Sequence, residues 1–373
     1  MRIERIELYH IKMPLVAPFQ TSGWTEVDRA VPLVAVYSQG LVGWGECVAS
    51  QGPWYSYETD ETAWLILSEY LIPMVLGQDI TDPSQPFQLT RRVRGHNMAK
   101  AALEMAIWDL LGQAQGVSLA QMLGGVRDCV EVGVSVGIQP SIQATLQTIQ
   151  GYLDMGYRRI KIKIKPGWDV EVVRAIRREF GDIRLQVDAN SAYRLDEALP
   201  VFKAMDAQGL LLIEQPLGED DILDHAKLQP HLHTPLCLDE SIHTLDHARW
   251  ALEVGACRVI NIKQGRVGGL WVSRQIHDLC QAQGIPVWCG GMLETGIGRA
   301  ANVALASLPN FRLPGDISAS DRYYHEDLID PPFRLNPDST LTVPTGPGLG
   351  VRPVPERLAK VTLRRAEFCA SRG

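Results

Sequence analysis

The chain has 373 residues, too many for one ordinary domain and enough for a barrel of about 200–250 residues with a smaller companion. Hydrophobic residues make up 46% and charged residues 21%, as in a soluble globular enzyme. The net charge of −7 gives nucleic acid no basic face, and no run approaches the roughly 18 apolar residues of a membrane span. The seven cysteines contain no Cys-x-x-Cys pair, and the charged start Met1–Arg5 does not resemble a signal peptide. We therefore expect a cytoplasmic protein with reduced, buried thiols.

The first third of the chain predicts an α+β domain. Residues 2–12 and 31–38 alternate apolar and polar side chains, as antiparallel strands do, and helical patterns cover 57–76 and 98–115. Between the two strands, the loop from Phe19 to Trp24 has two interpretations. General loop statistics favour a surface turn, whereas its two aromatic residues fit a lid over a pocket in the neighbouring domain. The composition changes near residue 125, so we place this domain at residues 1–125.

From residue 126 short apolar runs alternate with amphipathic segments, which is typical of βα units around a parallel sheet. The predicted strands cover 130–136, 158–164, 183–188, 210–214, 235–239, 257–263 and 285–289, and residues 311–315 would close the barrel. The predicted helices cover 141–154, 169–180, 194–206, 221–229, 244–253, 268–282 and 296–307. These elements predict a TIM barrel over residues 126–319. Segment 320–373, with strands and turns over 333–350 and a charged helix or tail over 355–371, is expected to return to the first domain and complete it.

Five charged residues stand at the ends of successive predicted strands. They are separated by 25, 26, 25 and 24 residues, and they are Lys163, Asp188, Glu214, Asp239 and Lys263. Barrel enzymes carry their chemistry where strands end at the C-terminal face, so three carboxylates would lie side by side between two opposed lysines. Such carboxylates favour a hard divalent cation, Mg²⁺ above all. A cation flanked by two bases indicates a site that moves a proton at carbon.

Each of these residues has a simpler explanation when it is taken alone. An acidic residue at a strand end is usually a helix cap, and lysines along one strand face are common on a solvated edge. A closed barrel has no edge, so Lys161 and Lys163 must point inward, where a nearby cation would lower the lysine pKa. We therefore expect Lys163 and Lys263 to be catalytic, Lys161 to support them, and Asn190 and Glu240 to orient the metal ligands. The nine histidines form no set that suits a zinc hydrolase.

The substrate is expected to meet several other segments. Gly290–Gly296 follows the seventh predicted strand and opens a helix, where backbone N–H groups favour an anion such as a second substrate carboxylate. The substrate-binding candidates are Ser135, Gly291, Met292 and Leu293, with pocket walls from Phe19, Trp54, Tyr55 and Tyr323. Asp109 lies inside a strong helix and is expected to be structural.

With these residues in place, the sequence resembles the enolase superfamily and its muconate-lactonizing subgroup. Lys161-Ile162-Lys163 is similar to the subgroup's Lys-x-Lys, the three strand-end carboxylates match its metal ligands, and Lys263 matches its second lysine. Four longer stretches resemble the branch of o-succinylbenzoate synthases and N-acylamino acid (N-succinylamino acid) racemases: Gly156–Asp169, Val187–Tyr193, Trp288–Gly296 and Asn310–Asp316. The resemblance spans nearly the whole chain. It implies a modified barrel, roughly (β/α)7β, with an α+β capping domain, Mg²⁺ with Mn²⁺ or Co²⁺ as substitutes, and a homo-oligomer.

The resemblance also implies a reaction. A substrate carboxylate on Mg²⁺ would acidify the neighbouring carbon, Lys163 would remove its proton, and the Lys263 ammonium would help to stabilise the enediolate. In a synthase, hydroxide then leaves, so that 2-succinyl-6-hydroxy-2,4-cyclohexadiene-1-carboxylate becomes o-succinylbenzoate in menaquinone biosynthesis. In a racemase, the two lysines act from opposite faces of an N-succinyl or N-acyl amino acid. The synthase is our main prediction and the racemase the alternative, and one enzyme can have both activities because the same groups serve both.

Two positions leave the substrate preference undecided, and two other classes of protein remain as alternatives. Ser50 stands where relatives often carry a large apolar residue, and Tyr323 where some carry Phe. A barrel that only binds ligand would need no opposed lysines. A metal-dependent hydrolase would activate water without Lys263 and would not exchange an α-proton.

Overall fold

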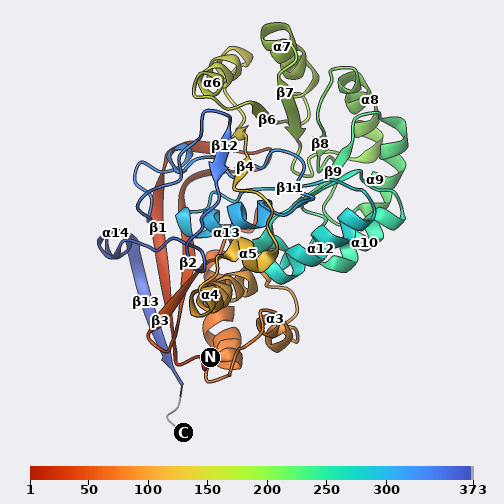
Figure 1. Cartoon of the computed structure of the whole chain (residues 1–373). Coiled ribbons are helices and arrows are strands. Elements are labelled where there is room, and N and C mark those ends of the chain that lie inside the picture. Colours follow the sequence, from red (N-terminus) through yellow and green to blue (C-terminus); the bar gives the residue numbers. More distant parts are fainter. Residues whose placement is uncertain (371–373) are drawn as a thin grey trace.

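A parallel sheet of seven strands forms the barrel in this computed structural model, which describes residues 1–370 (Figure 1). Each strand is hydrogen-bonded to the next in chain order. The strands are β5 (Val134–Val136), β6 (Arg159–Lys163), β7 (Arg184–Asp188), β8 (Ile213–Glu214), β9 (Leu236–Leu238), β10 (Val259–Ile262) and β11 (Val287–Cys289). Parallel bridges from Phe311 to Val287 and from Gly315 to Val132 connect the two edges, so segment 311–315 closes the barrel as predicted.

Amphipathic helices cover the outside of the barrel. In α7, for example, Val172, Val173, Ala175 and Ile176 are buried, whereas residues 171, 174, 178 and 179 are exposed. The helices are α6 (Ile142–Asp154), α7 (Val170–Phe180), α8 (Leu195–Asp206), α9 (Ile222–Leu228), α10 (Leu245–Glu253), α11 (Gln264–Val267), α12 (Leu270–Ala282) and α13 (Gly296–Ala306), with a 3₁₀ turn at Gln229–His231. The prediction of one helix over 268–282 is wrong at its start. Gly268 and Gly269, with φ of +94° and +129°, separate α11 from α12, because a helix cannot contain these angles.

The first predicted barrel strand, 130–136, is two strands. β4 (Cys129–Glu131) pairs antiparallel with β12 (Thr340–Thr342), and only β5 joins the barrel. Gly133 separates them, and a side chain there would collide with the buried Arg159. The break therefore makes room for an arginine inside the barrel.

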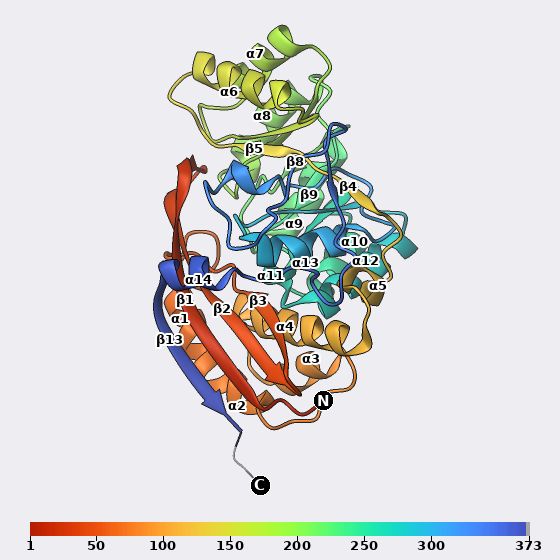
Figure 2. The same ribbon diagram turned by 60° about the vertical axis from the view of Figure 1, so that its left-hand side comes forward.

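An antiparallel sheet with its own helices forms the cap, which we define as residues 1–124 together with β13. The sheet has the order β13–β1–β2–β3, with β1 (Arg5–Gln20), β2 (Thr25–Ser38), β3 (Leu41–Glu46) and β13 (Thr362–Cys369). Its helices are α1 (Asp60–Ile66), a π-helical turn (Leu67–Leu71), α2 (Ile72–Val75), α3 (Gln85–Thr90), α4 (Asn97–Gln115) and α5 (Leu119–Leu123). Figure 2 shows α4 between this sheet and the barrel, and most of its residues are buried. The predicted barrel with an α+β cap is confirmed.

The first two strands are longer than predicted and make the segment between them a hairpin. The ladder from β1 to β2 continues past Pro14 and ends with Gln20 opposite Thr25. β13 covers β1 only as far as Ile11, so beyond this point β1 is an edge strand, where prolines are tolerated. The hairpin tip reaches the barrel, where Gln20 O accepts a hydrogen bond from Ile138 N at 2.9 Å (Figure 2).

The end of the chain returns to the cap as a strand. α14 (Pro355–Val361) is followed by β13, which pairs antiparallel with β1 from Arg5 to Ile11. The prediction of a helix or tail over 355–371 is therefore right only for its first turns, because the backbone of 362–369 pairs with the free edge of β1. Residues 371–373, the end of that segment and of 320–373, lie outside the described residues.

Five of the seven cysteines are buried and two are exposed. Cys129 and Cys369 lie on the short strands β4 and β13, so the expectation of buried thiols is wrong for these two. Within residues 1–370, every helix is too short or too polar to cross a bilayer.

Candidate active site

The charged residues predicted at the strand ends meet at one end of the barrel. Adjacent strands are in register, so Lys163 pairs with Asp188 and Asp188 with Glu214. Asp239 follows β9 and Lys263 follows β10, which completes a row of three carboxylates between two lysines. None of the five side chains belongs to a residue more than 7% exposed. The row is therefore a buried ionic cluster.

Each lysine is held by carboxylates of the row. Lys163 Nζ lies 2.6 Å from Asp188 Oδ2. Lys161 Nζ lies 3.1 Å from the same oxygen and 2.9 Å from Glu214 Oε2. At the other end, Lys263 Nζ lies 2.7 Å from Asp239 Oδ2. The two predicted catalytic amines thus stand at opposite ends of the carboxylate row.

The ion pairs of this arrangement raise the pKa of Lys161 and Lys263, and the lowering expected from a nearby cation stays a prediction. Burial lowers the pKa of each ammonium, because a charge loses its hydration inside the barrel. The neighbouring carboxylates outweigh this effect for Lys161, and Tyr55 with the carboxylates does so for Lys263, so both pKa values lie above the ordinary 10.5. Ion pairing therefore keeps both groups charged.

The carboxylates respond to the same neighbours in different ways. Burial raises the pKa of Asp188, but the adjacent Lys163 and Lys161 reverse the change and hold it below its ordinary value. Burial and the Asp188 charge raise the pKa of Glu214. Glu214 therefore lies in a cluster where additional positive charge is favourable.

The donor set at the strand ends fits a divalent cation. It consists of carboxylate oxygens, which Mg²⁺ prefers, and the Lys161 ammonium already bridges two of them as a cation would. In this conformation the three carboxylates do not bring one oxygen each within 4.8 Å of one another. Within residues 1–370, the group His10, Asp60 and Glu61 does meet this distance. The lysines turn Asp188 and Glu214 toward β6, whereas Lys263 and Arg266 pair with Asp239. The expected convergence on one point therefore requires these ion pairs to shift.

Asn190 and Glu240 lie against the row, as expected. Asn190 N donates to Asp188 Oδ1 at 3.0 Å, and its side-chain amide donates to Glu240 Oε1 at 2.9 Å. The φ of +43° at Asn190 is a left-handed backbone conformation, which is uncommon for residues other than glycine. Burial and the Asp188 charge raise the pKa of Glu240 to about 7. Asn190 Oδ1 and Glu240 Oε2 are buried without a partner.

A pocket with an empty volume of about 520 Å³ opens onto both lysines. The cap and the barrel both line it, and all the predicted substrate-binding residues are present: Phe19, Tyr55, Ser135, Gly291, Met292, Leu293 and Tyr323. Thr21 and Trp24 also line it, so segment 19–24 is a hairpin turn that lies over the pocket, a position that fits the lid interpretation. Trp54 is the exception among the expected walls, because its side chain is 65% exposed and lies over Gly52.

Tyr55 does more than form a wall. Its hydroxyl donates to Asp239 Oδ1 at 3.0 Å and lies 3.2 Å from Lys263 Nζ. The Lys263 ammonium also lies 4.4 Å from the centre of the Tyr55 ring. A residue of the cap thus contacts the catalytic end of the barrel directly.

Several residues of the site were missed in the sequence. Asp316 directly follows the closing segment 311–315, and its Oδ2 lies 3.0 Å from Lys161 Nζ. Asn261 shares a strand face with Lys263 and donates to Glu214 Oε1 at 2.7 Å. Asp316 could have been predicted from its position at the end of the closing segment, and Asn261 from its position two residues before Lys263 on the same strand. Arg266 pairs with Asp239 from the short helix α11, and no periodicity marks it.

The far side of the pocket carries a buried polar network. Arg29 donates to Ser50 Oγ at 2.9 Å and pairs with Glu26 Oε2 at 3.1 Å, and Ser50 Oγ donates to Glu26 Oε1 at 2.7 Å. Ser50 therefore contributes a hydrogen-bonded side chain to this part of the pocket wall. Spacing did not predict this, because the network joins β2 to the segment after β3.

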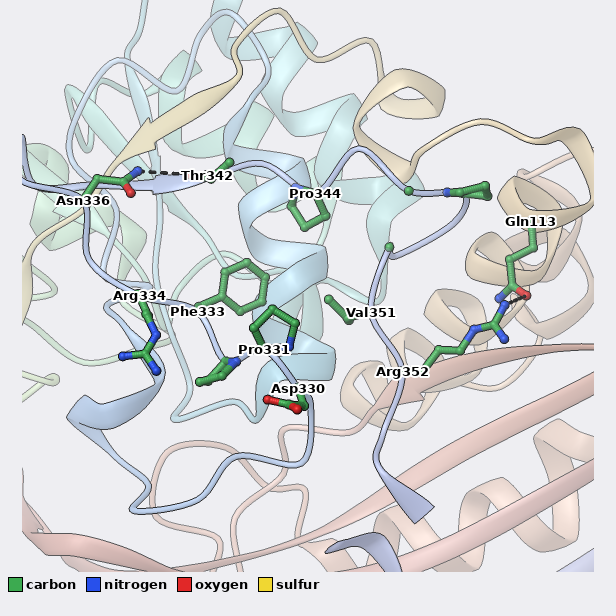
Figure 3. Close-up of a pocket in the computed structure, with 14 residues that line it drawn as sticks. Gln113, Asp330, Pro331, Phe333, Arg334, Asn336, Thr342, Pro344, Val351 and Arg352 are labelled. Atoms are coloured by element: carbon green, nitrogen blue, oxygen red, sulfur yellow. Dashed lines mark hydrogen bonds between the residues drawn. The ribbon is translucent and has the colours of Figure 1, made fainter. Parts of the chain in front are cut away.

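A hollow with an empty volume of about 1340 Å³ lies elsewhere, along the C-terminal segment. Figure 3 shows Arg334 and Arg352 on opposite sides of it, with Phe333 and Pro331 between them. Asp330 is the carboxylate among its lining residues. It therefore lacks the converging ionisable groups of the barrel site.

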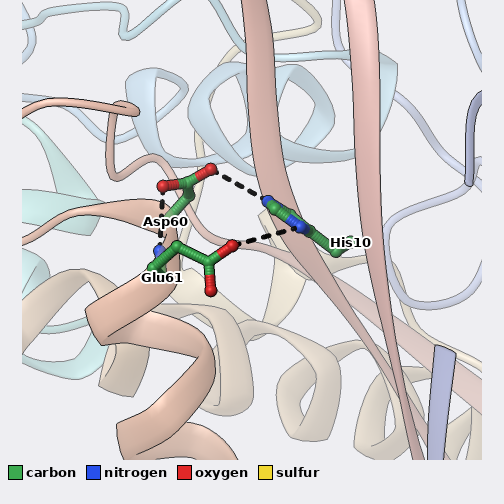
Figure 4. A group of neighbouring side chains, drawn as sticks. All are labelled: His10, Asp60 and Glu61. Carbon is green, nitrogen blue, oxygen red and sulfur yellow. Dashed lines mark hydrogen bonds and ion pairs between the residues drawn. The ribbon is translucent and has the colours of Figure 1, made fainter. Parts of the chain in front are cut away.

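His10, Asp60 and Glu61 form a second group of possible metal ligands (Figure 4). Asp60 Oδ2 lies 2.9 Å from Nε2 of the imidazole, whereas Glu61 Oε1 lies 3.9 Å from Nδ1. Arg364 also pairs with Glu61, at 2.6 Å. The two carboxylates address different ring nitrogens, so the group is an ion-pair network that joins β1, α1 and β13.

Comparisons with known proteins agree over the whole chain. Family profiles match residues 5–124 ("Mandelate racemase / muconate lactonizing enzyme, N-terminal domain") and 144–357 ("Enolase C-terminal domain-like"). An o-succinylbenzoate synthase of Geobacillus kaustophilus is 52% identical, covering 94% of this chain and 93% of that protein. An N-succinylamino acid racemase of Amycolatopsis sp is 53% identical, covering 97% and 98%. A solved enolase-superfamily structure from Listeria innocua has a TM-score of 0.95 at 40% identity, with both chains covered completely. The chain therefore belongs to the enolase superfamily, as an enzyme of the mandelate racemase/muconate lactonizing enzyme family, among relatives that are o-succinylbenzoate synthases and N-succinylamino acid racemases.

Proposed function

We propose that this enzyme is an o-succinylbenzoate synthase, which dehydrates 2-succinyl-6-hydroxy-2,4-cyclohexadiene-1-carboxylate. The observation that carries the proposal is the pair of buried amines, Lys163 and Lys263, at opposite ends of a carboxylate row inside one pocket. The similarity to the Geobacillus synthase supports the choice of reaction. On the family resemblance alone, the proposal extends to menaquinone biosynthesis and to a cytoplasmic homo-oligomer.

Asp188, Glu214 and Asp239 would hold Mg²⁺ in this proposal, with Asn190 and Glu240 orienting them. When bound, the ion supplies Lewis acidity to the substrate carboxylate and makes the neighbouring carbon acid stronger. The carboxylate donors of the row support this metal, and Mn²⁺ or Co²⁺ would substitute for it.

The lysines perform the proton chemistry. Lys163 Nζ takes the proton from the carbon next to the substrate carboxylate, and the Lys263 ammonium stabilises the charge that develops on the carboxylate oxygens. The C–O bond at the next carbon then breaks, and Lys163 Nζ returns its proton to the departing hydroxide, which leaves as water. Lys161 supports Lys163 by keeping Asp188 and Glu214 in place.

The pocket walls would select a small carboxylate with a succinyl or acyl arm. Ser135, Gly291, Met292 and Leu293 would contact its polar groups, whereas Phe19, Tyr55 and Tyr323 would cover its ring or side chain. Because cap and barrel enclose the pocket together, water would be excluded when the hairpin tip lies over the substrate.

The alternative is racemisation of an N-succinyl or other N-acyl amino acid. Lys263 favours it, since a buried amine at the opposite end of the row can deliver a proton to the second face of the α-carbon. The Amycolatopsis racemase is as similar to this chain as the synthase is. Both activities can therefore reside in this one enzyme.

The test compares the two reactions in one preparation. We would measure kcat/KM with Mg²⁺ for the cyclohexadiene dehydration and for racemisation of N-succinylphenylglycine in D₂O, with Lys163→Ala as the control. We expect efficient dehydration, slower racemisation with deuterium entering the α-position, and loss of dehydration in the variant. More efficient racemisation would make the alternative the main activity. Absence of both reactions and of deuterium exchange would overturn the proposal.

A further inference from the structure

The loop 290–295, which lines the pocket, is anchored by a carboxylate from the cap. Glu46 is the last residue of β3 and is 1% exposed. Its Oε1 accepts a hydrogen bond from Thr295 N at 3.0 Å, and its Oε2 accepts from Thr295 Oγ1 at 2.6 Å and from Gly298 N at 2.9 Å. Glu46 thus caps the N-terminus of the barrel helix α13 from a different domain, where a negative charge is favourable.

The loop needs such anchors because its backbone is strained. Leu293 has a φ of +60°, a left-handed conformation that costs free energy for a leucine. Glu294 Oε2 accepts from Met292 N at 2.8 Å, and Tyr324 Oη donates to Leu293 O at 2.6 Å. Thr295, the next residue, is fixed by Glu46 through both its backbone and its side chain. The segment that faces the substrate is therefore held from both sides.

We propose that Glu46 is a positioning residue, which acts through Thr295 and Gly298 to hold Gly291–Leu293 against the substrate. The inference rests on the proposed function, in which these residues contact the substrate. Beyond that function, it states that a carboxylate of the cap, and not only the barrel, determines the shape of the pocket. The acid-base groups are not involved, since the hydrogen bonds of Glu46 go to Thr295 and Gly298.

The charge state of Glu46 is part of this role. An ionised carboxylate accepts all three hydrogen bonds, whereas a protonated one has a hydrogen that needs an acceptor of its own. Burial, together with the nearby Glu294 charge, outweighs the donors of Thr295 and Gly298, which lower the pKa of Glu46, and raises that pKa to about 7. Arg29 of β2 and Tyr324 also face it, as does Cys47 beside it. Below about pH 7 the wild-type loop should therefore loosen.

Glu104 provides a matched control at the same interface. It lies on α4 of the cap and is 2% exposed, and its Oε1 accepts from Trp271 N at 2.8 Å at the start of the barrel helix α12. Trp271 does not line the pocket. Glu104→Gln therefore disturbs a cap carboxylate of the same kind, with the same substitution, away from the loop.

The experiment compares Glu46→Gln with Glu104→Gln in the Mg²⁺-loaded full chain, by hydrogen exchange and by kinetics. We expect Glu46→Gln to speed amide exchange in peptides covering 290–298, to raise KM about tenfold and to change kcat less than about threefold, because one hydrogen bond to a charged group is lost. The wild-type KM should rise as pH falls through about 7, and this rise should vanish in the variant. Glu104→Gln should leave both KM and the exchange over 290–298 unchanged.

Thr295→Val keeps the proposal testable if Glu46→Gln folds poorly. It removes the hydroxyl donor, so it should raise KM in the same way, and the double variant should add little to either single change. Equal KM effects of Glu46→Gln and Glu104→Gln would mean that Glu46 only stabilises the contact between cap and barrel, and would overturn the proposal. So would unchanged exchange over 290–298. Amide exchange does not depend on turnover. An inactive wild type would therefore contradict the proposed function, while the exchange over 290–298 would still test the role of Glu46.

Discussion

The buried carboxylate row has a consequence for metal binding that activity is not needed to detect. Glu214 has a raised pKa in a cluster that favours added positive charge, so a cation bound there stabilises the folded state. We expect saturating Mg²⁺, at about 100 times Kd, to add about 2.7 kcal/mol to the unfolding free energy, with EDTA reversing it. Glu214→Gln should abolish the shift in Tm. Asp316→Asn, which also removes a carboxylate from Lys161, should keep it, and equal responses in both variants would place the metal elsewhere.

The opposed lysines predict different defects in the racemisation reaction. Each amine faces one side of the α-carbon, so removing either one should slow racemisation by about 10²–10⁴-fold. The remaining lysine can still exchange the α-proton of the enantiomer whose hydrogen points toward it. We therefore expect Lys163→Ala and Lys263→Ala to catalyse deuterium exchange into opposite enantiomers of the N-succinyl amino acid, as read by NMR. Exchange into the same enantiomer by both variants would contradict the two-sided arrangement.

At the residue level, the sequence predicted what parallel strands dictate. Lys163, Asp188 and Glu214 end neighbouring strands, and register alone brings them together. The contacts of Arg266 and Tyr55 with Asp239 could not be predicted from strand ends, because they depend on α11 and on the position of the cap. The predicted lowering of the lysine pKa depends on a nearby cation, whereas the carboxylates that Lys161 and Lys263 contact raise it, and strand periodicity does not show these contacts.

Among the elements, the hairpin tip offers the clearest test of how the pocket is covered. Trp24 lines the pocket, and its ring packs edge-on against Tyr55 with centroids 6.4 Å apart. Trp24→Ala should lower kcat/KM by about tenfold, since a covering aromatic contact is lost, while Tm changes little because the ring is only half-buried. Val27→Ala, at a residue of β2 that is 59% exposed, is the control and should change neither value. A large fall in Tm for Trp24→Ala would instead make the residue part of the core.

The elements that sequence patterns missed share a physical reason. β1 continues past Pro14 because β13 no longer covers it there and an edge position tolerates proline. β13 forms only because the distant strand β1 offers a free edge. The break between α11 and α12 was visible in Gly268-Gly269, but amphipathic periodicity over 268–282 outweighed it. Local pattern therefore predicted helices and barrel strands well, and it failed where pairing is set by distant segments.

For the molecule as a whole, buried carboxyl groups with a raised pKa predict a contribution to stability that is lost as pH rises. Burial raises the pKa of Glu104 to about 8, from an ordinary value of 4.5. The folded state then keeps this proton while the unfolded state loses it, so the contribution is fully present below the unfolded pKa and is lost as pH rises through the folded one. Glu104→Gln should flatten the fall between about pH 5 and 8 by up to about 1.4 kcal/mol per pH unit. Urea unfolding at several pH values measures this. Glu179→Gln, at an exposed position of α7, should leave the slope unchanged, and parallel curves for Glu104→Gln and wild type would contradict the prediction.

The cap is closed by the two ends of the chain, and this predicts how the molecule fails when one end is removed. β13 covers β1 from Arg5 to Ile11, and its Arg365 lies 2.6 Å from the buried Glu7 (Figure 2). A chain ending at Val361 loses this backbone ladder, and each lost hydrogen bond costs roughly 0.5–1.5 kcal/mol. Tm should therefore fall by several degrees, and the exposed edge of β1 should promote aggregation. Activity should fall with Tm, because the cap supplies Tyr55 and the hairpin tip to the pocket. Arg365→Ala removes two ion pairs of a half-exposed side chain, to Glu7 and Glu367, each worth about 1 kcal/mol or less. It should spare both properties, because Glu7 keeps its ion pair with Arg5. A truncated chain with wild-type Tm and kcat/KM would show that the barrel can hold the cap in place without its last strand.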